Sequence, residues 1–127
     1  MSKSIVINIE KVEDGYTAYA KARSIFAEGD TFAEVKENFK EALALQCEHT
    51  GEDVKQLALV MVFDVPSLFD AFDFIKTKSF ATRIGMNVTL LNHYAKGVKK
   101  PGAKQKVRIE QGIQTLVQEL ASAHVTV

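Results

Sequence analysis

The chain has 127 residues, of which 46% are hydrophobic and 25% are charged. This size and composition exclude a disordered chain and allow one ordinary packed domain or two very small ones. The longest apolar run, residues 57–63, is far too short to span a membrane. The single cysteine, Cys47, cannot form an internal disulfide, which indicates a reducing environment, so we expect a cytoplasmic protein with no membrane association.

The net charge of zero conceals a strong asymmetry between the two halves of the chain. Residues 1–65 contain seven basic and twelve acidic residues, whereas residues 66–127 contain nine basic and four acidic ones. From Lys76 to Arg108 there are nine basic residues and no acidic residue. Such a segment attracts a polyanion by Coulomb steering, although a solvated basic surface explains a charge run equally well. The change of charge and pattern predicts two domains, residues 1–65 and 66–127.

The first half has the pattern of a small sheet with one helix. Ile5, Ile7 and Ile9 have the two-residue period of a half-buried strand. The turn residues 13–15 lead to a second strand, from Tyr16 to about Ala22, and residues 25–28 could form a short third strand. Leu57 to Phe63 would be a fourth strand, and because it is apolar on both faces we expect it to be central or covered by the helix.

A helix is predicted between the third and fourth strands. Thr31 and Glu34 form a capping box, and Gly51 ends the helix at about His49. Its apolar stripe consists of Phe32, Val35, Phe39, Ala42, Leu43 and Cys47. Cys47 is therefore expected in the core and not as a nucleophile, which would need an exposed thiolate. The order βββαβ predicts a compact α+β unit.

The second half is predicted to be all helical. A first helix starts at Pro66-Ser67, with Ser67 as N-cap, and its buried stripe is Leu68, Phe69, Phe72 and Ile75. A short helix follows from about Ser79 to Ile84, then a turn at Gly85. A further helix runs from Val88 to Lys96, with Asn87 as its N-cap. A basic loop, residues 99–102, leads to a final helix over about 103–122. That helix has one apolar face made of Ile109, Ile113, Leu116, Val117 and Leu120.

Two helices joined by a short turn with glycine can form a helix-turn-helix, whose second helix enters the major groove. Leu91 and Tyr94 should face the core with Ile84 and Met86. The side chains expected to read base edges are Thr89, Asn92, His93 and Lys96. Those expected over phosphates are Lys76, Lys78, Arg83, Lys99, Lys100 and Lys104. A generic helical hairpin is the alternative interpretation of this pair.

Residues that could support catalysis or metal binding are sparse. Glu10 and Asp64 lie at strand ends and could approach each other, but no third strand carboxylate completes a magnesium cluster. Three separated histidines and one cysteine have no metal-ligand spacing. There is no phosphate loop, nucleophile elbow or dinucleotide fingerprint. We predict that the chain is not an enzyme and needs no metal or cofactor.

Two sets of motifs resemble those of a known family. The first set is Asp14-Gly15-Tyr16, residues 26–31 and residues 34–42. The second set is Phe80-Ala81, Ile84-Gly85-Met86-Asn87, Leu90-Leu91, Tyr94, Gly97 and Lys99-Lys100-Pro101. Over nearly the whole chain these motifs resemble the HicB-type antitoxins of HicAB toxin–antitoxin modules. The segment 21–24 departs from that family, whose members commonly have a proline- and glycine-containing loop between the second and third strands.

The resemblance implies a partial RNase H-like fold for the first domain and a helix-turn-helix for the second. It implies an antitoxin that neutralises a HicA-type mRNA-cleaving toxin and represses its own operon by binding operator double-stranded DNA. Helix-turn-helix repressors act as dimers, so a homodimer or higher homo-oligomer is expected. One alternative is a stand-alone transcriptional regulator whose first domain dimerises or senses a ligand. Another is an interaction module that binds no DNA.

Overall fold

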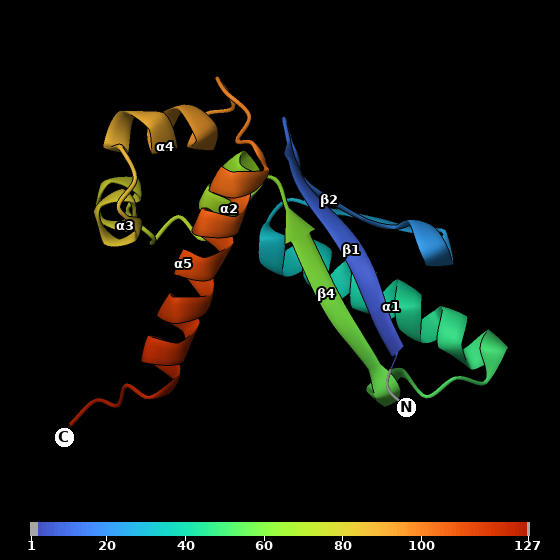
Figure 1. Cartoon of the computed structure of the whole chain (residues 1–127). Helices are drawn as coiled ribbons and strands as arrows, with labels where there is room; N and C mark the ends of the chain where they lie inside the picture. The colour runs from blue at the N-terminus through green and yellow to red at the C-terminus, as the bar shows by residue number, and fades with distance from the viewer. Residues whose placement is uncertain (1–2, 127) are drawn as a thin grey trace. The chain divides into compact units, whose positions relative to one another are not determined.

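The computed structural model describes residues 3–126 of the chain (Figure 1). Contacts between residues divide it into two compact units, one extending to Phe72 and the other beginning at Asp73. The described part is a mixture of four strands in one sheet and five α-helices, as expected for an α+β protein. None of the helices within residues 3–126 is both long enough and apolar enough to cross a lipid bilayer.

The first unit is built on a sheet whose strand order is β3-β2-β1-β4. β1 (Lys3–Val12), β2 (Gly15–Ala20) and β3 (Ile25–Gly29) form an antiparallel meander, and β4 (Leu57–Phe63) runs parallel to β1. Gly15 has φ of 144°, and a Cβ atom on it would collide with the carbonyl oxygen of Gly29 on β3. Only glycine therefore fits the tight turn between β1 and β2.

Helix α1 (Phe32–Thr50) covers one face of this sheet, as Figure 1 shows. The predicted N-cap is confirmed: the Thr31 hydroxyl accepts a hydrogen bond of 3.1 Å from the Glu34 N–H. The predicted stripe is also confirmed in its central part, since Val35, Phe39, Leu43 and Cys47 are buried. They pack on Ile5, Ile7 and Ile9 of β1, which are buried as their alternation predicted. The buried Cys47 thiol belongs to this core.

The expectation that β4 could be central is wrong. β4 is an edge strand, with β1 on one side and no strand of residues 3–126 on the other. Its inward residues do pack against the core to which α1 contributes. Its outward residues Ala58, Val60 and Val62 are exposed, and those of its other face are only half-buried. The prediction relied on the apolar residues of both faces of β4. Apolar faces do not show whether a strand has neighbouring strands on both of its edges.

The connection from β2 to β3 is a single 3-10 turn, Lys21–Arg23, followed by Ser24 in the left-handed region. The Arg23 guanidinium forms two hydrogen bonds, of 2.6 and 2.9 Å, with the Glu52 carboxylate beyond α1. These bonds, and a further one from the Thr50 hydroxyl, lower the pKa of Glu52 to about 2. The segment that departs from the family pattern is thus held to the end of α1 by an ion pair.

Helix α2 (Val65–Ala71) belongs to the first unit, although we expected it to open the second domain. Its N-cap is Asp64, which accepts from the Ser67 N–H at 2.8 Å, and not Ser67 as predicted. Ser67 is buried instead, and its hydroxyl accepts a 2.8 Å hydrogen bond from the Lys11 N–H of β1. The helix ends before Phe72 and Ile75, which we had placed on its stripe.

The second unit consists of α3 (Thr77–Ile84), α4 (Val88–Ala95) and α5 (Ala103–Ala121), close to the predicted bounds. Its buried residues are Phe80, Ala81, Met86, Leu91, Tyr94, Ile109 and Gly112. The expected apolar face of α5 is buried only in its first half. Ile113 and Leu116 are half-buried, whereas Val117 and Leu120 are exposed.

Candidate nucleic-acid interface

The turn between α3 and α4 is fixed from three directions. Gly85 adopts φ of 69°, which favours glycine, and its N–H donates to carbonyls of the last turn of α3. The Asn87 side chain then caps α4 by accepting from the Leu90 N–H at 3.1 Å. The Arg108 side chain on α5 donates to the Gly85 carbonyl oxygen at 3.0 Å. The angle between the two helices is therefore specified by local hydrogen bonds and by α5.

The inner side of α4 packs into the core of the second unit. Leu91 is fully buried and Tyr94 is 6% exposed, as their spacing predicted. Met86, in the turn, is also buried, and Ile84 is half-buried. Burial of one side of a short helix fixes which residues face outward.

The four residues predicted to read bases lie along one stripe of α4. Thr89 and Lys96 are exposed, and Asn92 and His93 are half-buried. Their spacing of three, four and seven residues puts them on the same side of a helix. Lys96 is the C-cap, one residue beyond the last helical position, Ala95. The structure thus brings the four predicted side chains together, and two of the four are partly covered by neighbouring residues.

Five of the six residues predicted over phosphates are exposed lysines without an ion-pair partner among residues 3–126: Lys76, Lys78, Lys99, Lys100 and Lys104. The sixth, Arg83, differs. Its guanidinium forms hydrogen bonds of 2.7 and 3.1 Å with Glu119 of α5, which lowers the pKa of that carboxyl. Arg83 therefore already has an anionic partner within the protein, whereas the five lysines have none among residues 3–126 and are available to an anionic ligand.

Two further basic residues of this segment were not selected from the sequence. Lys106 is exposed on the first turn of α5, and its place in the acid-free run was a sufficient signal. Arg108 supports the Gly85 turn, and no sequence pattern indicates that role because it depends on how α5 packs.

Helix α5 approaches α3 closely at Gly112. A Cβ atom at this position would collide with the Ile84 side chain and lie 3.0 Å from the ring of Phe80. Gly112 is buried within a helix, where glycine is otherwise unfavourable relative to alanine. The glycine therefore allows α5 to pack at a short distance from α3.

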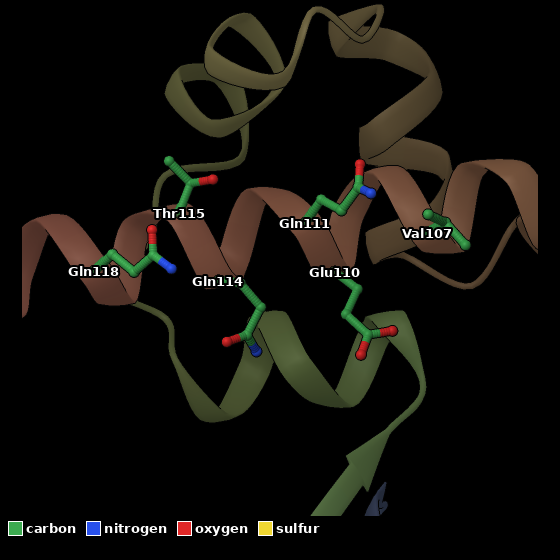
Figure 2. A pocket seen from close by; sticks show the side chains of 6 residues that line it. All are labelled: Val107, Glu110, Gln111, Gln114, Thr115 and Gln118. Atoms are coloured by element: carbon green, nitrogen blue, oxygen red, sulfur yellow. The ribbon is translucent and has the colours of Figure 1, made fainter.

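An open hollow lies along α5. Figure 2 shows its six lining side chains: Val107, Glu110, Gln111, Gln114, Thr115 and Gln118. They project to different sides of the helix and do not converge on one point. Glu110 is the one ionisable side chain among them. Within residues 3–126, no three histidine, cysteine or acidic side chains are grouped as metal ligands.

A second open hollow lies at the turn between β1 and β2, and it is strongly acidic. Carboxylates provide five of its nine lining residues: Glu13, Asp14, Glu28, Asp30 and Glu34. None of the five forms an ion pair with another residue of the described chain. The first unit thus presents a concentrated negative surface.

Comparison with known protein families, curated proteins and solved structures found no match to this chain.

Proposed function

We propose that the chain is a DNA-binding regulator, in which α3 and α4 form a helix-turn-helix and α4 reads the major groove. One observation carries this proposal. A stripe of polar side chains on α4 lies in a segment that has no acidic residue and whose exposed lysines form no ion pair within residues 3–126. Asparagine and lysine in such a position match adenine and guanine edges, and the flanking lysines match phosphates.

The test is discrimination between operator and random DNA. Changing Asn92 and His93 together to alanine removes two side chains from the reading stripe. We expect the preference for operator DNA to fall by roughly 10-fold or more, since each good base contact contributes about 1–3 kcal/mol of discrimination. Binding to random DNA should change little, and both affinities can be measured by fluorescence anisotropy with DNA from upstream of the gene.

Gln111→Ala with Gln114→Ala is the matched control, because it removes two exposed polar side chains of α5 outside the acid-free stretch. Unaltered discrimination in the Asn92/His93 variant would show that α4 is not the reading helix.

We further propose that the chain is an antitoxin of the HicB type, whose first unit is a partial RNase H-like fold that binds a small basic RNase. The support is electrostatic. Up to Phe72 the chain has seven basic and thirteen acidic residues, and from Asp73 onward it has nine basic and three acidic ones. The acidic hollow concentrates part of this negative charge. Such a surface suits masking a nuclease that binds RNA, because complementary charge steers association and specificity.

Reversing charge at the hollow is expected to abolish neutralisation. Glu13→Lys with Glu28→Lys replaces two of its carboxylates with cations, and like charges then oppose a basic partner. In cells that express a neighbouring small RNase, the full-length variant should fail to restore growth.

Glu37→Lys with Glu41→Lys is the control, since it makes the same change of net charge on the exposed side of α1. Equal rescue of growth by both variants would mean that the acidic hollow does not bind the toxin.

A further inference from the structure

The two edge strands of the sheet in the first unit, β3 and β4, differ in how well they are protected from pairing with another strand. β3 is short, ends in Glu28-Gly29, and lies beneath α1. The Asn38 side chain of α1 donates to the Glu28 carbonyl oxygen at 2.8 Å, and the Gln46 side chain donates to the Arg23 carbonyl oxygen just before β3. Charged residues, short length and side-chain caps are means by which proteins prevent strands from pairing at an edge.

β4 has none of these protections. All seven of its residues are apolar, and it contains no proline, charge or bulge. No side chain among residues 3–126 forms a hydrogen bond with its main chain. Val60 and Val62 are 43% and 44% exposed on one face, and Leu59 and Met61 are half-buried on the other. An edge of this kind leaves a row of main-chain donors and acceptors available to another strand.

We infer that β4 pairs antiparallel with β4 of a second copy of this chain, about a two-fold axis at Val60, to give a continuous eight-stranded sheet. The alternation of faces limits the possible registers, because a shift of one residue would place outward side chains opposite inward ones. Centring on Val60 pairs all seven residues. Ala58 then lies opposite Val62 of the other copy on the outer face, and Leu59 opposite Met61 on the core face.

The sequence of β4 favours a second copy over an unrelated strand. A two-fold pair places apolar residues opposite apolar residues on the outer face and again on the core face. The strand itself contains no charge that pairing would leave uncompensated. β4 is thus complementary to itself along its length.

Disulfide trapping tests the register directly. Val60→Cys should form a reducible dimer under mild oxidation, because the two Cβ atoms face each other across the axis. Neither Ala58→Cys nor Val62→Cys alone should cross-link efficiently, whereas the double variant should. Val6→Cys is the control: it is 52% exposed on the same face and adjacent to Val60 on β1. The two Val6 positions would be separated by three strand spacings, about 14 Å, which is too far for a disulfide.

Sedimentation of the full chain provides an independent measurement. Val60→Lys places like charges opposite each other at the axis, so the dimer dissociation constant should rise at least about tenfold, the equivalent of 1.4 kcal/mol. Phe26→Lys is the matched control on the β3 edge, where the side chain is 56% exposed, and it should not alter association. Melting curves of both variants establish that they are folded.

The inference would be overturned by a wild-type chain that remains monomeric, or by Val60→Lys dimers as stable as wild type together with no Val60→Cys cross-link. It does not depend on DNA binding. A monomeric Val60→Lys chain that still prefers half-site DNA over random DNA supports both proposals. Loss of that preference in the Asn92/His93 variant would support the helix-turn-helix proposal and would not bear on pairing through β4.

Discussion

Replacing Gly112 with valine is expected to destabilise the second unit. The new side chain would occupy space now taken by Ile84 and the ring of Phe80. Overpacking of this kind costs about 1–3 kcal/mol, and a small domain loses roughly 4–8 °C of Tm for each kcal/mol. Thermal unfolding of the full chain, followed by circular dichroism, measures the effect.

Gln111→Val is the control for that experiment. It adds the same β-branched residue to the same helix at an exposed neighbouring position. Its Tm should stay near that of wild type, because surface substitutions usually change stability by less than about 0.5 kcal/mol. If Gly112→Val melted with the control, the close packing of α5 on α3 would not contribute to stability.

The second large effect concerns the salt dependence of DNA binding. Lys99→Ala with Lys100→Ala removes two exposed cations from the basic loop. Removing one lysine–phosphate interaction should flatten the slope of log K against log salt concentration by roughly 0.9, so the double variant should differ by about 1.8. Affinity for operator and random DNA should fall together, because phosphate-binding side chains position the protein without reading sequence.

Arg83→Ala is the informative comparison in the same titration. Arg83 is exposed and basic, but Glu119 already holds its guanidinium through two hydrogen bonds. Its removal should therefore flatten the slope less than removal of one lysine does. An unchanged slope for the Lys99/Lys100 variant would exclude these lysines as phosphate ligands, and a large change for Arg83 would mean that the pair with Glu119 opens on binding.

Most of the local structure follows from short-range patterns. The alternation of Ile5, Ile7 and Ile9 identifies the inner face of β1, because a strand has a two-residue period. Thr31 and Asn87 are both N-caps as predicted, since their side chains satisfy N–H groups only three residues away. The inward side of α4 could likewise be assigned from the spacing of Leu91 and Tyr94.

The errors concern interactions between residues distant in sequence. Asp64 and Ser67 are both capping residue types, and their spacing alone does not show which one caps α2. Ser67 is not the cap because its hydroxyl accepts a hydrogen bond from the Lys11 N–H, which is 56 residues away in the sequence. The pairing of Arg83 with Glu119 is similarly distant. The position of β4 at the edge depends on strand order, which side-chain periodicity does not encode.

The hydrogen bond from Arg108 to Gly85 determines which fragment of the second unit could be fused to another protein and still hold α4 in place. The turn that orients α4 receives part of its support from a helix that begins only after the basic loop. Gly112, one turn further along, holds that helix against α3. A peptide cut after the basic loop would retain α3, α4 and their turn but lose this brace. The smallest fragment that could be fused to another protein as a DNA-targeting part therefore extends through Gly112.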